Sequence, residues 1–169
     1  IEENLALAYT RASKHSTPFS RAITKKSVKF FRENLARYNM GIEDRMKTKI
    51  GLLSGGQRQV VTLLMCTLSI PKLLLLDEHT AALDPATAER VMEITKQIVD
   101  ENNITTMMIT HNLNQSLTTG TRTIMLDGGE IILDLSGRER DEMTMDDLIK
   151  MYSAKKQKQF DNDRMLLSR

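Results

Sequence analysis

Two adjacent carboxylates, Asp77 and Glu78, stand directly after a run of four leucines at 73–76. A short, continuously apolar run is typical of a central parallel strand that is buried on both faces. Ligands bind in open α/β sheets at the carboxyl ends of the strands, so Asp77 is placed to hold Mg²⁺, through water because this ion gives up its hydration shell reluctantly. Glu78 could polarise a water molecule that attacks a phosphate. Alternatively, the pair simply ends a strand and begins a turn.

A glycine-rich segment earlier in the chain offers a site for an anion. Ser54, Gly55 and Gly56 stand at the start of a predicted helix. Unhindered backbone N–H groups, a hydroxyl and the positive end of a helix dipole together attract negative charge. The alternative is an ordinary serine N-cap followed by flexible glycines.

His111 follows a second predicted strand, 105–110. If this strand pairs with the strand that carries Asp77 and Glu78, the imidazole lies beside the two carboxylates, since the carboxyl ends of parallel strands meet at one edge of a sheet. A lone histidine is more often structural. At a strand end in the same sheet, however, a contact with the phosphate or the attacking water is favoured.

A phosphate-binding loop is missing from the sequence. Such a loop requires Gly-Lys followed by Ser or Thr, and none of the eight glycines precedes a lysine. We therefore expect the chain to carry the catalytic half of a nucleotide-dependent machine without its phosphate-binding half. Because residue 1 is Ile rather than Met, we also expect a truncated or proteolysed part of a longer protein.

The composition fits part of a single globular domain. The chain has 169 residues and a net charge of +2, with 11 Lys/Arg against 5 Asp/Glu in residues 1–50, an imbalance that is most simply a solvated face. Seven aromatic residues, without alternation with basic ones, argue against a platform for single-stranded nucleic acid. The lone Cys66 lies in an apolar run and is expected in the core. No apolar run approaches the ~18 residues that would span a bilayer.

Hydrophobic periodicity divides the chain into a helical first part and an alternating second part. Strand–helix–strand order predicts an α/β fold with a mostly parallel sheet. Asp84 and Pro85 fit the N-cap and first turn of a helix, and 127–130 is typical of a hairpin turn. The expected helices are 2–13, 25–40, 53–69, 86–102, 112–118 and one from 144, and the expected strands are 72–77, 105–110, 123–126 and 131–135.

Four motifs occur in a characteristic order: Leu53–Gln57, Leu73–Glu78, Ala81–Asp84 and Thr110-His111. They resemble, in turn, the signature, Walker B, D-loop and H-loop motifs of ATP-binding-cassette (ABC) ATPases. The resemblance implies the C-terminal part of an ABC transporter nucleotide-binding domain that lacks the Walker A motif.

The resemblance also implies how the chain is divided into domains. We expect a helical subdomain at 1–70, an incomplete RecA-like (P-loop NTPase) core with a mostly parallel sheet at 71–135, and a C-terminal helical extension at 136–169. The first of these would contact transmembrane partners.

In that family, Asp77 would contact the Mg²⁺ shell, Glu78 would be the general base and His111 would be the switch histidine. The signature residues would bind the γ-phosphate of an ATP molecule held by the other subunit, and the D-loop aspartate would also belong to the nucleotide site. These cofactor-binding residues are Ser54, Gly55, Gly56, Gln57 and Asp84.

Two residues depart from the commonest family pattern. His79 replaces the usual proline after the catalytic glutamate, and Ala82 replaces the frequent D-loop serine. Both changes are tolerable, although Ala82 weakens any expectation of a hydroxyl contact across the dimer.

The implied function is that of the ATP-hydrolysing subunit of an ABC membrane transporter, with ATP and Mg²⁺ as cofactors. The implied partners are a second ATPase subunit, which closes an ATP sandwich, and transmembrane permease subunits, with a peripheral location on the cytoplasmic face of the cell membrane. By itself the chain should be inactive, and its unpaired strand edges could associate with other copies. The alternatives are a soluble ABC-class ATPase acting on nucleic acid or ribosomes, and a non-catalytic binding fragment; we expect no nucleic-acid partner.

Overall fold

A computed structural model describes residues 1–12 and 23–154 of the chain. The chain divides into two compact units, of which the first comprises Ile1–Ile109 and the second begins at Thr110. The predicted ends of the first helix, at residue 13, and of the last, beyond 154, lie outside the described residues. The predicted domain limits at 70 and 135 remain a prediction.

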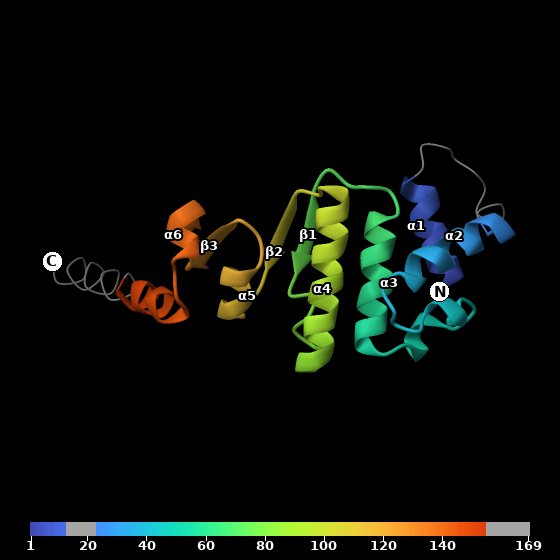
Figure 1. Cartoon of the computed structure of the whole chain (residues 1–169), viewed down its shortest axis with the longest axis horizontal. Coiled ribbons are helices and arrows are strands. Elements are labelled where there is room, and N and C mark those ends of the chain that lie inside the picture. Colours follow the sequence, from blue (N-terminus) through green and yellow to red (C-terminus); the bar gives the residue numbers. More distant parts are fainter. Residues whose placement is uncertain (13–22, 155–169) are drawn as a thin grey trace. The chain divides into compact units, whose positions relative to one another are not determined.

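Helices form the first part of unit 1, as the periodicity predicts, and they pack against one another (Figure 1). The second helix ends earlier than residue 40, because Asn39 and Gly41 take left-handed backbone conformations, with φ of 50° and 64°, that turn the chain. The helices are α1 (Glu2–Ala12), α2 (Lys25–Ala36) and α3 (Gly55–Thr67), and two short 3-10 turns lie at η2 (Glu43–Arg45) and η3 (Ile50–Leu52).

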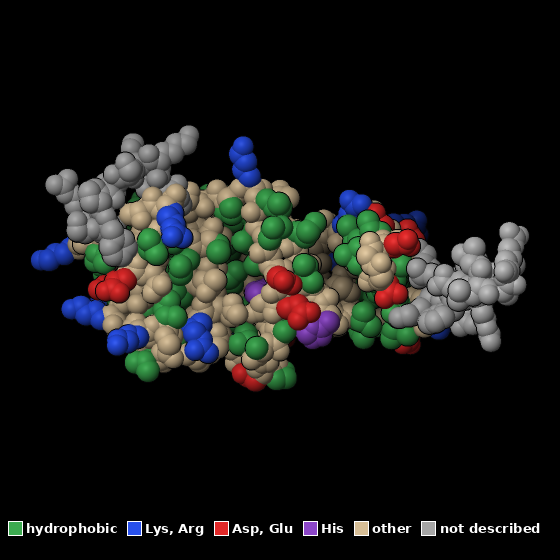
Figure 2. Space-filling model, turned by 180° about the vertical axis from the view of Figure 1, so that it is seen from behind, with side chains coloured by type: hydrophobic (Ala, Val, Ile, Leu, Met, Phe, Trp, Pro, Cys, Tyr) green, Lys and Arg blue, Asp and Glu red, His purple; other side chains and the backbone are tan. Residues whose placement is uncertain are grey.

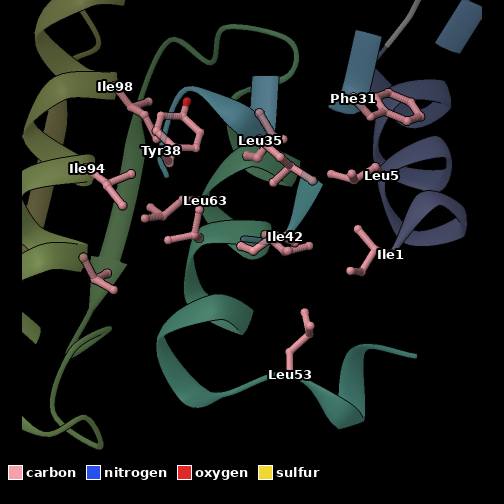
Figure 3. Packing of buried hydrophobic residues seen from close by; sticks show 14 of the residues in the cluster. Ile1, Leu5, Phe31, Leu35, Tyr38, Ile42, Leu53, Leu63, Ile94 and Ile98 are labelled. Carbon is pink, nitrogen blue, oxygen red and sulfur yellow. The ribbon is translucent and has the colours of Figure 1, made fainter. Parts of the chain in front are cut away.

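A single hydrophobic cluster joins these helices to the rest of unit 1. Phe31 and Leu35 of α2 are fully buried, and Figure 3 shows Phe31 near Leu5 of α1. At the other side of the cluster, Ile94 and Ile98 of α4 (Pro85–Asn102) are each at most 2% exposed. Burial of large aliphatic and aromatic side chains is the main favourable term in folding, so this cluster holds the helices of unit 1 on its strands.

Two parallel strands and the helix between them form the second part of unit 1. The strands β1 (Leu74–Asp77) and β2 (Thr106–Ile109) are parallel, and Asp77 stands opposite Ile109 in the register. Parallel strands need a crossover connection, which α4 supplies. The α/β class and the incomplete core are therefore confirmed, and the predicted parallel pairing holds for this pair of strands.

The prediction that β1 is buried on both faces is wrong for the described residues. Leu74 and Leu76 are buried in the cluster that includes α4, whereas Leu75 is 66% exposed. Its register partner Met107 is also exposed, as is Ile109. Successive side chains of a strand point to opposite faces, and the described helices cover only one face of this pair. Hydrophobic side chains reach the surface in the space-filling view as well (Figure 2).

The prediction that Cys66 lies in the core is also wrong, because its side chain is exposed. The buried residues of α3 include Val60, Val61 and Leu64. At 100° per residue, position 66 falls on the opposite side of the helix from these residues. The apolar run therefore contains one solvent-facing position that composition alone does not reveal.

Unit 2 contains an antiparallel hairpin. The strands β3 (Arg122–Asp127) and β4 (Glu130–Ser136) pair through a two-residue turn at Gly128 and Gly129, with φ of 57° and 85°. Such a turn requires positive φ at both positions, which glycine adopts without strain. The predicted hairpin is confirmed. Within the described residues of unit 2 these strands form a two-stranded sheet.

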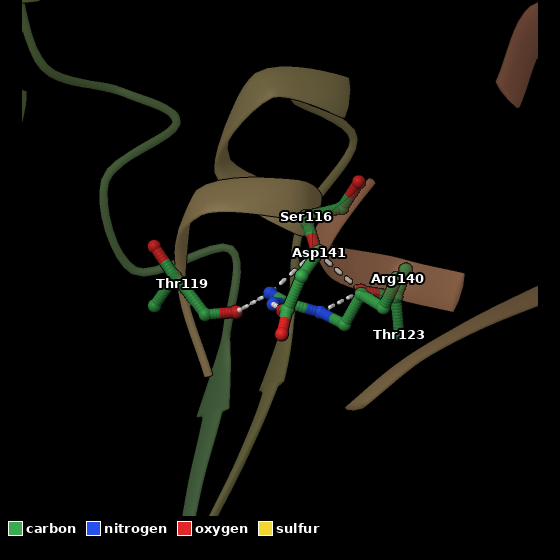
Figure 4. Close-up of polar contacts among 5 residues, drawn as sticks. All are labelled: Ser116, Thr119, Thr123, Arg140 and Asp141. Carbon is green, nitrogen blue, oxygen red and sulfur yellow. Dashed lines mark hydrogen bonds and ion pairs between the residues drawn. The ribbon is translucent and has the colours of Figure 1, made fainter. Parts of the chain in front are cut away.

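A buried arginine ties the helices of unit 2 to this hairpin (Figure 4). Arg140 lies in α6 (Gly137–Asp141), and its guanidinium donates to Thr123 Oγ1 of β3 at 2.9 Å. It also donates to the Thr119 carbonyl, just after α5 (Leu113–Thr118), at 2.8 Å. A buried charge is tolerated only when hydrogen bonds satisfy it, as these do for the Arg140 guanidinium. After α6, residues 145–154 of unit 2 form a further helix.

Two neighbouring leucines test the one-sided burial of β1. Leu76→Ala should lower the free energy of unfolding by about 2–4 kcal/mol, because it removes buried methyl groups and leaves a cavity against the cluster. Leu75→Ala, the matched control on the exposed face, should change it by less than about 1 kcal/mol. Urea unfolding followed by circular dichroism measures both, and equal losses would contradict the one-sided burial.

Candidate functional site

The two predicted catalytic carboxylates lie where β1 ends. Asp77 is the last residue of the strand, and the Glu78 backbone N–H donates to the Ile109 carbonyl of β2 at 3.0 Å. Both carboxylate side chains are exposed. Glu78 has a φ of 43°, a left-handed conformation that is rare for a residue with a side chain. The chain therefore leaves the sheet abruptly and with backbone strain at the residue predicted to be the base.

The strained residue opens a short turn that leads into α4. The Glu78 carbonyl accepts a hydrogen bond from the Ala81 N–H at 3.0 Å. Asp84 then caps α4 by accepting from the Thr87 N–H at 3.0 Å, as the Asp-Pro pair predicts. Hydrogen bonds from Thr87 hold the pKa of Asp84 below its ordinary value.

His79 is anchored to α4 within this turn. Its Nε2 lies 3.1 Å from the hydroxyl oxygen of Thr95, which is only 4% exposed. The Thr95 hydroxyl donates in turn to the Val91 carbonyl at 2.8 Å. Burial lowers the pKa of His79. No periodicity or motif points to this pair, because its members are separated by 16 residues.

Ser54 and Gln57 form a reciprocal cap at the start of α3. The Ser54 hydroxyl accepts from the Gln57 N–H at 3.3 Å, and the Gln57 amide oxygen accepts from the Ser54 N–H at 3.2 Å. Gln57 also donates to the Met40 carbonyl at 3.0 Å. This arrangement fixes the first turn of α3 and its backbone N–H groups. The side chain of Gln57 is thus engaged in structural hydrogen bonds, and its role in binding a nucleotide remains a prediction.

The two glycines after Ser54 allow a close contact between α3 and the segment that follows Glu78. A Cβ added at Gly55 would meet Leu83 Cδ2 at 2.8 Å, and one added at Gly56 would meet Thr87 Cγ2 at 2.3 Å. A Cβ at either position would force its neighbour to shift, and the overlap is greater at Gly56 than at Gly55, where it involves the end of a leucine side chain. Unit 1 therefore brings the predicted anion site against the turn that begins at the predicted catalytic carboxylates.

The structure leaves the predicted role of His111 untested. This residue is exposed and precedes Asn112, which caps α5 in unit 2, whereas Asp77 and Glu78 belong to unit 1. The neighbouring Thr110 hydroxyl accepts from the Asn112 N–H at 3.0 Å. His111 stays a candidate on its sequence position alone.

Asp77 is the residue that the sequence predicts as a ligand of Mg²⁺. Within residues 1–12 and 23–154, no three His, Cys, Asp or Glu side chains gather to hold a metal ion. Mg²⁺ is commonly bound by one or two carboxylates together with water and substrate phosphates. One exposed carboxylate at the end of a parallel strand agrees with this pattern, and Asp77 is the residue that would hold the ion.

Comparisons with family models and with known proteins agree on one family. A family model described as "ABC transporter" matches residues 2–81. A "Tyrosine transport ATP-binding protein" of Clostridioides difficile (strain R20291) is 42% identical over 156 residues, which cover 90% of this chain and 59% of that protein. The chain thus spans less than two thirds of this relative's length.

Solved structures with the same fold are more distant in sequence. An ABC transporter in an inward-facing conformation superposes with a TM-score of 0.67 at 24% identity, covering 89% of this chain and 56% of that one. A nucleotide-free ATP-binding cassette from an ABC transporter gives a TM-score of 0.65 at 18% identity, covering 90% and 62%. These likenesses establish the fold.

The fold, the order of the motifs and these relatives define an α/β domain of the ATP-binding-cassette class. The chain belongs to the ABC transporter family and corresponds to part of its nucleotide-binding domain. No helix in the described ranges is both long and apolar enough to cross a membrane.

Gly56 should be intolerant of even one methyl group. Gly56→Ala should lower the free energy of unfolding by about 1–3 kcal/mol, because its Cβ would overlap Thr87 and force α3 away from α4. Gly51→Ala is the matched control, since a Cβ there meets nothing within 4 Å. Thermal unfolding of the two variants checks this, and a Gly56→Ala variant as stable as the parent would contradict the close contact.

Proposed function

We propose that the chain is the part of an ABC transporter's ATP-hydrolysing subunit that carries the general base and the phosphate-contacting signature segment. The observation that supports this proposal best is the contact in unit 1 between two sites. The N-terminal end of α3 packs through Gly55 against Leu83 of the turn that links Glu78 to α4, and through Gly56 against Thr87 in the first turn of α4. An anion-binding helix end and an exposed carboxylate thus belong to one packed assembly.

Glu78 acts in this proposal as the general base. An exposed carboxylate at a strand end can orient and deprotonate the water that attacks the γ-phosphate. Asp77, one residue earlier, holds Mg²⁺, and this ion neutralises charge on the phosphates when it is bound. Asp77 has strand geometry and Glu78 has the left-handed conformation of the turn, so the two carboxylates start from different backbone conformations.

The start of α3 binds phosphate in the proposed ATP sandwich. Ser54 supplies a hydroxyl, and Gly55 and Gly56 contribute first-turn backbone N–H groups at the positive end of a helix of 13 residues, in which Gly56 is buried against Thr87. The γ-phosphate that they meet belongs to ATP held by a second ATPase subunit. Gln57 and Asp84 hold the two helix starts in shape around this site.

The proposed partners follow from the family to which the chain belongs. A second ATPase subunit completes the nucleotide site, and transmembrane permease subunits convert ATP hydrolysis into transport at the inner face of the membrane. His111 contacts the γ-phosphate or the attacking water in this scheme. The transported molecule is recognised by the permease, so these residues carry no assignment of substrate.

The isolated 169-residue chain should not bind ATP in the micromolar range and should not hydrolyse it. Most of the affinity of such domains for the β- and γ-phosphates comes from the backbone nest and lysine of a phosphate-binding loop, and this sequence has no Gly-Lys pair. Isothermal titration calorimetry with Mg-ATP measures this. Tight one-to-one binding would contradict it.

Three substitutions in an ATPase that contains this chain together with a phosphate-binding loop should separate three roles. Glu78→Gln should bind ATP normally and lower kcat at least about a hundredfold, since only the base is lost. Asp77→Asn should weaken binding of Mg-ATP itself. Ser54→Arg should leave ATP binding intact and block closure of the dimer, because a bulky side chain occupies the phosphate contact.

Nucleotide binding, ATP turnover and sedimentation of the ATP-bound dimer give the three readouts. Near-normal turnover in Glu78→Gln would remove Glu78 as the base. Equal loss of nucleotide binding in all three variants would overturn the assignment of separate roles.

A further inference from the structure

Glu78 is strained, and His79, the residue that follows it, contacts α4. Glu78 holds a φ of 43°, a left-handed conformation that is strained for a residue with a Cβ. Such strain persists only where neighbouring contacts oppose its relaxation. Rotation of Glu78 back to negative φ would redirect the chain that follows, beginning with His79.

The His79 contact with α4 opposes this relaxation. His79 Nε2 lies 3.1 Å from Thr95 Oγ1, and the Thr95 hydroxyl donates its own proton to the Val91 carbonyl at 2.8 Å. A hydroxyl has one proton to donate, so it must accept from the imidazole, which assigns the proton to Nε2. His79 is half-buried and Thr95 is buried, so water competes little for the bond.

The hydrogen bond between His79 and Thr95, called the anchor below, attaches the turn to a rigid element. Thr95 lies in the middle of α4, a helix of 18 residues whose Val91, Ile94 and Ile98 are buried in the core of unit 1. A side chain that is bonded to such a helix cannot move without breaking the bond or displacing the core. The turn is thus fixed at both ends, by the Glu78 N–H to Ile109 bond at the strand and by His79 at the helix.

We propose that His79 is a positioning residue for Glu78: its hydrogen bond to Thr95 holds the strained turn after β1 and thereby fixes the direction of the Glu78 carboxylate. The proposal rests on the proposed role of Glu78 as general base. It assigns to this side chain the conformational restriction that a proline, the usual residue at this position in the family, supplies through its ring. A hydrogen bond replaces a covalent constraint here.

Nuclear magnetic resonance of the 169-residue chain tests the anchor without any nucleotide. Imidazole ¹⁵N shifts of His79 should show a proton on Nε2 in the parent, and Thr95→Val should change this signature. A strong intraresidue amide–Hα contact at Glu78, which reports positive φ, should be present in the parent and lost in His79→Ala. His79→Gln, which keeps an N–H donor, should retain it.

Enzyme kinetics test the consequence in an ATPase that contains this chain and a phosphate-binding loop. His79→Ala and Thr95→Val should each lower kcat about tenfold to a hundredfold, the effect of a catalytic group displaced by about 1 Å, while KM for ATP changes less than about twofold. The double variant should be no worse than either single one. His79→Gln and Thr95→Ser should recover most of the activity.

Thr67→Val is the matched control for the loss of a hydroxyl. Thr67 Oγ1 also donates to a carbonyl four residues earlier in its helix, that of Leu63, at 2.8 Å. This variant should leave kcat unchanged. Circular dichroism confirms that each variant is folded.

The outcomes distinguish this proposal from the proposed function. A positive φ at Glu78 that survives His79→Ala would overturn the anchor, and an unchanged kcat in His79→Ala would overturn its catalytic consequence. A parent ATPase that is inactive, or one whose activity survives Glu78→Gln, would instead remove the proposed function, while the resonance experiment still decides whether His79 holds the turn.

Discussion

The close contact between the first turns of α3 and α4 is the constraint on which the candidate site depends. Gly56 permits it, because any Cβ at that position would overlap Thr87. The contact brings the serine cap of one helix and the aspartate cap of the other to the same part of unit 1, so that Ser54 and Asp84 begin neighbouring helices. Two helix N-termini side by side repel each other electrostatically unless negative charge lies near them. The Asp84 carboxylate supplies some of this charge within the chain itself, and a bound phosphate would supply more.

Strain and anchoring are combined in the segment between β1 and α4. Glu78 leaves the sheet in a left-handed conformation, while hydrogen bonds from both sides of the turn keep it there. Local strain of this kind is found at functional sites because it orients one side chain at the expense of stability. The hydrophobic cluster that buries Val91 and Ile94 provides the stability that offsets this cost. Packing of the core and orientation of the candidate base are thus coupled through α4.

The exposed apolar face of the β1–β2 pair shows the other consequence of one-sided packing. Leu75, Met107 and Ile109 are each more than half exposed, although the sequence around them is typical of a buried strand. Among the described residues only the opposite face is covered, by the cluster that contains Leu74 and Leu76. Exposed apolar faces and strand edges favour association with other polypeptide. The expectation that isolated copies of the chain associate therefore remains a prediction with a structural basis.

Local chemistry along the sequence determined much of this protein by itself: the cap at Asp84, the serine cap at Ser54, the glycine hairpin and the order of the ABC motifs all depend on residues a few positions apart. Only the tertiary structure decided which side of an apolar run meets solvent, as the exposure of Cys66 and Leu75 demonstrates. It also decided that His79 reaches the middle of α4. The physical reason is that caps and turns are satisfied within one or two turns of chain, whereas burial and long-range hydrogen bonds depend on how separate elements pack against one another.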